Sequence, residues 1–211
     1  MMKHFIKKYL VATSLVMVSL SSVAQPRIEP VQPNELTAEQ KKAAEDFFQS
    51  RKAPLTGPFL VLLHSPEMLT NASNMGLYLR YRSALGNQLS EMIILLTARH
   101  FTQDYEWFVH APIALREKIS EEIIDAIRDG RRPTKMTEDE TMAYNFAYEL
   151  LQNKRVSDMS YQAVEKRWGK KGAIDLTGIV GYYSLLAMEL NMANHQISDP
   201  SKKLPRFPSD R

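Results

Sequence analysis

Residues 89–114 read LSEMIILLTARHFTQDYEWFVHAPIA, and this stretch decides the fold class. Ser90 is placed to cap a strongly apolar helix that runs over about 91–101. A second helical segment is expected over about 104–118, with a proline inside it. Because polar and apolar residues do not alternate over more than a few positions, the stretch indicates helix and not strand.

Helix signals continue before this stretch. Thr37 and Gln40 have the spacing of a capping box and predict a helix over about 38–51. The short apolar run 59–64 is compatible with either a buried strand or a helix. An apolar stripe over 68–85 then predicts another helix.

Helix signals also continue after it, and each predicted helix has a start or stop residue. These are Ser120 before 121–129, Thr137 with Glu140 before a helix to Asn153, Ser157 or Ser160 before a helix ending at Gly169, and a long apolar helix over 173–194. The chain therefore predicts an all-α bundle of about seven helices.

Composition excludes several classes of protein. The chain has 211 residues, 44% of them hydrophobic and 24% charged, with eight glycines and eleven prolines, which is typical of a globular domain and not of a disordered or fibrous chain. The sequence contains no cysteine, which excludes disulfides, thiolate metal sites and thiol redox chemistry.

The first 24 residues have the three-part pattern of a secretory signal peptide. Three lysines precede an uncharged stretch over 9–20, and Ser22 and Ala24 supply small side chains for cleavage after Ala24. As a helix, the uncharged stretch would be roughly 18 Å long, too short for a hydrocarbon core of about 30 Å, so no stable membrane span is expected. The alternative is an apolar core helix. A signal peptide predicts a secreted or periplasmic protein.

The chain therefore divides into four predicted parts. These are a signal peptide at 1–24, a proline-rich linker or arm at 25–36, a helical domain at 37–197 and a flexible tail at 198–211. Loss of the three leader lysines takes the net charge from +3 to zero. Without a positive field, no nucleic-acid partner is expected.

The apolar content exceeds what exposed helices need to cover one core. The final helix is apolar over most of its circumference, and six methionines add to this surface: Met75, Met92, Met142, Met159, Met188 and Met192. This predicts either a homo-oligomer or a central buried helix.

Glu106 and His110 are the strongest candidates for chemistry. Four residues apart in a helix, they project from one face about one turn apart. Trp107, Phe108 and Val109 give them apolar surroundings, which shift pKa values towards the range that suits acid–base catalysis. The alternative is a solvated ion pair on the helix surface.

Arg99 precedes this pair and is a candidate for binding an anionic substrate, as are Arg80, Arg82 and Arg116. No metal site is expected, because HxxxH and HExxH are absent and the remaining histidines are scattered. No nucleophile turn or glycine-rich phosphate loop is present. We therefore expect no metal and no cofactor.

Residues 89–99, 105–114 and 119–124 together resemble the carboxymuconolactone decarboxylase family, which includes the alkylhydroperoxidase D proteins. The resemblance covers about 55–195, and 178–191 resembles the closing helix of the family. It implies an all-helical fold of the alkylhydroperoxidase D type that assembles into trimers or larger rings, with a pocket near a subunit interface.

The peroxidase branch of the family uses the motif ExxCxxCxxxH, and a chain without cysteine cannot perform that disulfide chemistry. The decarboxylase branch implies that Glu106 and His110 transfer protons on a small carboxylated lactone or unsaturated acid without a cofactor. Arg99 would bind the carboxylate, and Tyr105 and Trp107 would shape the pocket. The decarboxylase of the family works in the cytoplasm, whereas this chain is predicted to be exported. The resemblance therefore does not fix the identity of the substrate. A non-catalytic oligomeric protein that binds a small aromatic or hydrophobic acid is the alternative.

Overall fold

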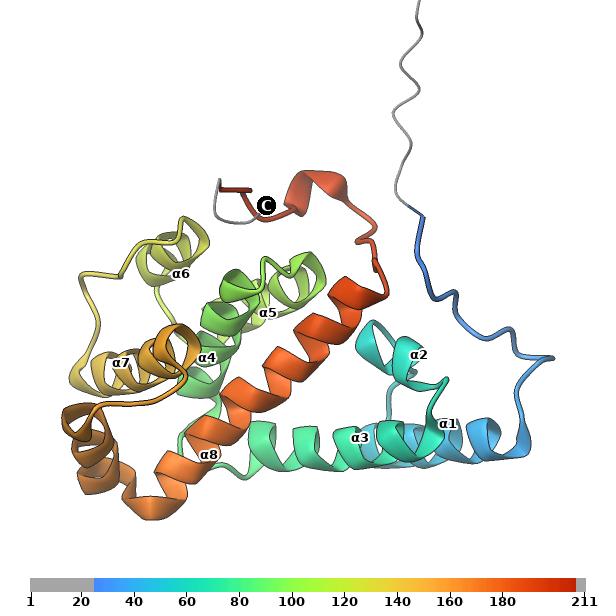
Figure 1. Ribbon diagram of the computed structural model, residues 1–211, viewed down its shortest axis with the longest axis horizontal. Coiled ribbons are helices and arrows are strands. Elements are labelled where there is room, and N and C mark those ends of the chain that lie inside the picture. The colour runs from blue at the N-terminus through green and yellow to red at the C-terminus, as the bar shows by residue number, and fades with distance from the viewer. Residues whose placement is uncertain (1–24, 208–211) are drawn as a thin grey trace, which may run out of the picture.

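The computed structural model describes residues 25–207, so the predicted signal peptide and its cleavage site lie outside the described residues, as do residues 208–211. The described chain is all-helical, without strands, which confirms the all-α class (Figure 1). Its elements are α1 (Ala38–Arg51), α2 (Pro58–Leu62), α3 (Pro66–Tyr81), α4 (Gly86–His100), α5 (Asp104–Arg116), α6 (Glu121–Arg128), α7 (Glu138–Asn153), α8 (Asp158–Met192) and a 3-10 turn, η1 (Pro200–Lys202).

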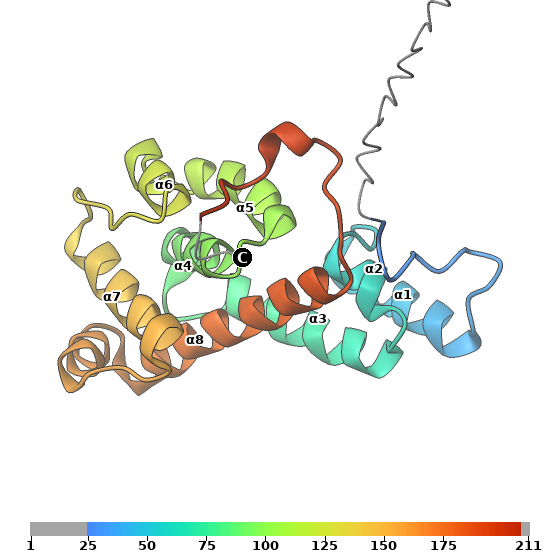
Figure 2. The ribbon, with the colours of Figure 1, turned by 45° about the horizontal axis from the view of Figure 1, so that its top comes forward.

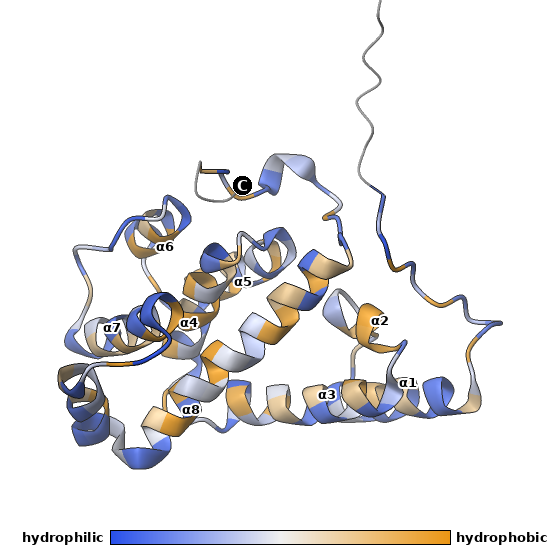
Figure 3. Ribbon diagram, in the orientation of Figure 1, coloured by the Kyte–Doolittle hydropathy of each residue, from blue (hydrophilic) through white to orange (hydrophobic). Residues whose placement is uncertain are grey.

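Helix α4 is the centre of the core. It contacts α3, α5, α6, α7 and α8, and every residue from Leu89 to Arg99 is buried. Full burial of a large aliphatic side chain contributes about 1.5–3 kcal/mol, so this helix supplies much of the hydrophobic stabilisation. Its ribbon is predominantly hydrophobic in Figure 3.

Helix α8 runs diagonally between the side of the bundle formed by α6 and α7 and the side formed by α1 to α3 (Figures 1 and 2). Gly169 has φ 71° and ψ −179°, which breaks the helix where the sequence predicts a stop. Within 25–207, α8 is the helix long and apolar enough to cross a membrane by length and composition. More than half of its apolar window is buried inside the protein, as in a core helix.

Side-chain caps explain where several helices begin. Both predicted capping boxes form, Thr37 with Gln40 and Thr137 with Glu140. The Ser120 hydroxyl accepts from the amide of Ile123, as predicted. Helix α8 begins after Ser157, whose hydroxyl accepts from the amide of Ser160, so Ser157 is the cap of the two alternatives.

The structure corrects one local prediction, the cap of α4, and decides between strand and helix for residues 59–64. Helix α4 begins at Gly86, so the prediction of Ser90 as its cap is wrong. The Ser90 hydroxyl donates to the carbonyl of Gly86 at 2.8 Å, a bond that lets serine lie inside a helix. The ambiguous run 59–64 contains most of α2, which starts at Pro58 because proline suits the first position of a helix.

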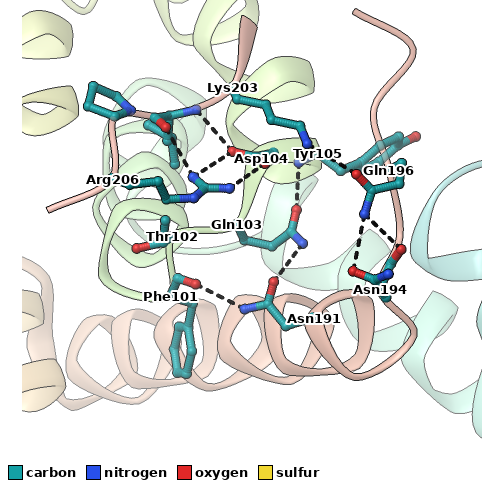
Figure 4. Close-up of polar contacts among 12 residues, drawn as sticks. Phe101, Thr102, Gln103, Asp104, Tyr105, Asn191, Asn194, Gln196, Lys203 and Arg206 are labelled. Carbon is teal, nitrogen blue, oxygen red and sulfur yellow. Dashed lines mark hydrogen bonds and ion pairs between the residues drawn. The ribbon is translucent and has the colours of Figure 1, made fainter. Parts of the chain in front are cut away.

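The arm and the tail both pack on the bundle. The irregular arm donates from the amide of Arg27 to the carbonyl of Ala193 at 2.7 Å, next to the end of α8. Residues 198–207, predicted as flexible, lie against the start of α5 (Figure 4). The Asp104 carboxylate accepts from the Leu204 amide at 2.9 Å and pairs with Arg206 at 2.6 Å, and Leu204 is buried. This part of the tail is therefore held by packing and by charge.

Several large apolar side chains remain on the surface. Met159 is 81% exposed and Ile174 is 71% exposed, whereas Met92 is fully buried in α4. Other exposed apolar side chains include Met75, Met188 and Met192. The chain therefore has both a buried central helix and uncovered apolar surface.

Candidate functional site

The start of α5 positions the predicted pair. The Gln103 side-chain oxygen accepts from the amides of Tyr105 at 2.5 Å and Glu106 at 3.2 Å, and its amide group donates to Asn191 of α8 at 3.0 Å (Figure 4). One turn later, His110 Nε2 lies 3.5 Å from Glu106 Oε2, and both side chains are buried. The structure therefore brings Glu106 and His110 together away from bulk solvent.

A second carboxylate holds the other side of the imidazole. His110 Nδ1 lies 2.6 Å from Glu91 Oε2, and the second oxygen of Glu91 accepts from Arg80 Nη2 at 3.3 Å. Glu91 is 3% exposed. Helices α3, α4 and α5 thus contribute a continuous chain of ionisable groups that runs from Arg80 through Glu91 and His110 to Glu106.

The protonation of this chain follows from its geometry. Glu91 is the closer carboxylate, so we assign the Nδ1 proton of His110 to a bond donated to Glu91, which leaves Nε2 facing Glu106. Burial raises the pKa of Glu106; the charge of Glu91 raises it further, whereas His110 and Arg80 oppose the shift. Nε2 faces the Glu106 carboxylate across 3.5 Å. Glu106 Oε1 has no hydrogen-bond partner among the described residues.

A cavity of about 460 Å³ adjoins the pair. Glu106 and His110 line it together with Tyr105 and Arg80. The lining also includes Phe47, Arg51, Phe59, Tyr182 and Tyr183. Binding pockets for small molecules commonly have volumes of about 300–1,000 Å³, so the cavity is large enough for a small organic acid.

No protein-family model matches the chain, and no curated protein matches it. The assignment of the site therefore rests on its geometry and residues. In the part of the chain that the structure describes, no group of three or more His, Asp or Glu side chains is arranged to hold a metal ion.

Two of the predicted substrate-binding residues lie elsewhere. Arg99 does not line this cavity: its Nη1 donates to the Pro205 carbonyl at 2.7 Å and its Nη2 to Thr102 at 2.8 Å. Arg99 is eight residues beyond Glu91, about 12 Å along α4, so it lies where the C-terminal segment packs. Trp107 packs in the core because adjacent helical residues face different directions.

Arg80, one of the other arginines that the sequence offers as candidates, lines the cavity, and so does Tyr105. Glu91 is the main residue that the sequence reasoning missed. Its signal is an isolated acid inside the apolar helix α4, because such an acid needs a polar partner. Its partner, His110, comes from a different helix and only the fold shows it.

Helix α8 contributes further buried polar groups. The ring of Tyr183 meets His110 edge-on, with centroids 5.3 Å apart, and burial raises its pKa well above the usual value. Both carboxylate oxygens of Glu189 are buried without a hydrogen-bond partner among residues 25–207, although the residue as a whole is partly exposed. Burial, with a contribution from Glu106, raises the pKa of Glu189 to about 8. Glu189 therefore binds a proton more tightly than a solvent-exposed glutamate does.

Proposed function

We propose that the protein is a cofactor-independent acid–base catalyst. It would decarboxylate or isomerise a small carboxylated lactone or unsaturated acid in the cavity beside Glu106 and His110. The observation that carries this proposal is the buried contact between Glu106 Oε2 and His110 Nε2 on the cavity wall. The resemblance of 89–124 to the carboxymuconolactone decarboxylase family supports the same reaction class.

Each group has a role in this reaction. Arg80 lines the cavity and pairs with Glu91, so it holds that carboxylate in place beside the site. In a decarboxylation, the bond between the α-carbon and the carboxylate breaks and its electron pair forms a dienolate. The proton shared by Glu106 and His110 then passes to carbon, and carbon dioxide leaves. In an isomerisation, the same pair removes a proton from one carbon and returns it to another.

Glu91 acts through His110 and is a positioning residue. Its short contact with Nδ1 fixes the imidazole tautomer and keeps Nε2 free for proton transfer. Its charge also stabilises the imidazolium that forms when Nε2 takes a proton. Arg80 balances this buried carboxylate, so the site does not contain an unpaired charge at Glu91.

We also propose that the protein is exported and that copies of the chain assemble into a homo-oligomer of the alkylhydroperoxidase D type. The leader pattern at 1–24 supports export. The exposed side chains of Met159 and Ile174 support association, because large apolar groups on a surface favour contact with another surface.

Turnover of a panel of unsaturated carboxylated lactones, followed both as carbon dioxide release and as isomerisation by proton NMR, tests this function. We expect turnover by the wild-type protein and a loss of at least about a hundredfold in Glu106→Gln and His110→Ala. The exposed Glu121 provides the matched control, and Glu121→Gln should keep full turnover. Equal turnover in wild type and both site variants would contradict the proposal. Saturable binding without turnover would instead support the non-catalytic binding protein.

A further inference from the structure

A second guanidinium lines the cavity and belongs to Arg51, at the end of α1. Its Nε donates to the Ser73 hydroxyl at 3.1 Å and its Nη2 to the Ser73 carbonyl at 3.0 Å. The guanidinium carbon also lies 5.0 Å from the ring centre of Phe47 and 4.7 Å from that of Phe59. These contacts fix the position of the cation.

Arg51 has no acidic partner in the described chain. Its hydrogen bonds there go to Ser73, so Nη1 retains its donors. Arg80 differs, because Glu91 neutralises it. Arg51 is half-buried. A cation that is fixed in place but not neutralised is suited to an anionic ligand.

The hydroxyl of Tyr182 and this cation both pack against Gly76 of α3. A Cβ atom added to Gly76 would lie 2.4 Å from the Tyr182 hydroxyl and 3.0 Å from Arg51 Nη2. Tyr182 is 2% exposed and lines the cavity, yet its hydroxyl has no hydrogen-bond partner among the described residues. Such a group is expected to have a partner when a ligand is bound.

We propose that Arg51 and Tyr182 form a carboxylate-binding subsite in this cavity. One carboxylate oxygen accepts from Arg51 Nη1 and the other from the Tyr182 hydroxyl. Burial raises the pKa of Tyr182, so the hydroxyl keeps its proton and donates. The rings of Phe47 and Phe59 beside the guanidinium suit an aromatic or unsaturated body.

This inference rests on the proposed function, because it assigns the ligand of the same cavity. It also bears on the reaction type. A guanidinium stabilises the carboxylate that decarboxylation would remove, so a carboxylate held here stays in the product. For a ligand with one carboxylate, the subsite therefore favours isomerisation over loss of carbon dioxide.

Binding of benzoate and its neutral analogue benzamide to the full chain, measured by calorimetry, tests the subsite. We expect Arg51→Gln to weaken benzoate binding about tenfold or more and Tyr182→Phe to weaken it severalfold, with little change for benzamide. Arg116→Gln, an exposed arginine outside the cavity, is the control and should bind like wild type. Unfolding midpoints show whether each variant folds. If Arg51→Gln does not fold, Tyr182→Phe decides the test.

Benzoate binding that is absent in the wild type, equal to benzamide binding, or unchanged in both variants would overturn the subsite. Failure of the proposed function gives a different result. If benzoate binding depends on Arg51 but no lactone is turned over, the subsite stands and the catalytic proposal fails. If turnover is found and Arg51→Gln changes neither KM nor benzoate affinity, the subsite fails and the catalytic proposal stands.

Discussion

Gly76→Ala tests the close approach of α3, Arg51 and Tyr182 that creates the subsite. Gly76 lies inside α3, where alanine is favoured over glycine by about 1 kcal/mol. The added Cβ would lie 2.4 Å from the Tyr182 hydroxyl oxygen and 2.8 Å from its Cζ. Both distances are shorter than a Cβ atom shows to a non-bonded atom in folded proteins. Tyr182 is 2% exposed and packed in the core, so it cannot swing away into solvent.

Two opposing effects decide the magnitude. Overpacking a well-filled site costs about 1–3 kcal/mol, and the helix propensity of alanine returns about 1 kcal/mol of that. We therefore expect Gly76→Ala to lower the free energy of unfolding by about 0–2 kcal/mol. Displacement of the Tyr182 hydroxyl should also weaken benzoate binding.

Gly181 of α8 is the matched control, because an added Cβ there meets no atom within 4 Å. Gly181→Ala should raise the free energy of unfolding by about 0.5–1 kcal/mol. Urea denaturation followed by circular dichroism measures the free energy of unfolding of both variants. The dependence of that free energy on urea concentration shows whether a variant also changes the surface exposed on unfolding. The reasoning would be refuted if Gly76→Ala were as stable as Gly181→Ala.

Two further predictions concern buried charges. Glu91→Gln leaves Arg80 without its carboxylate and His110 without its orienting anion. We therefore expect the free energy of unfolding, measured by urea denaturation, to fall by about 3 kcal/mol, and turnover to fall with little change in KM. A variant as stable as wild type would contradict this. Glu189 has its pKa raised from 4.5 to about 8, so the folded state keeps a proton that the unfolded state releases, and stability falls as pH rises between these values. Partial exposure of the residue limits this loss of stability to about 1–2 kcal/mol. Urea denaturation at pH 5 and pH 8 measures it, and Glu189→Gln should remove it. A variant that loses as much stability between the two pH values as wild type would contradict the raised pKa of Glu189.

Local signals explain what the sequence predicted well. The capping boxes at Thr37 and Thr137 and the break at Gly169 act within a few residues, so they can be recognised without the fold. The contact between Glu106 and His110 is local in the same way, because four residues make one helical turn.

Contacts between distant segments explain what the sequence did not predict. Glu91 contacts His110 across two helices, and Arg51 of α1 and Tyr182 of α8 pack against the same glycine of α3. The position of Arg99 could not be predicted for the same reason, since its Nη1 donates to the Pro205 carbonyl of the C-terminal segment. Such pairings depend on how the helices pack, which helical periodicity does not determine.

Exchange of carbon-bound hydrogen in deuterium oxide tests the central claim, transfer of a proton by His110 and Glu106 to a bound molecule, most directly. Proton NMR of the unsaturated carboxylated lactones measures the loss of the carbon-bound signals, whether or not carbon dioxide is released. We predict exchange at least about a hundredfold faster with the wild-type protein than with His110→Gln or Glu106→Gln. Exchange that is equally fast in the variants, or no faster than in buffer for every compound, would contradict the claim.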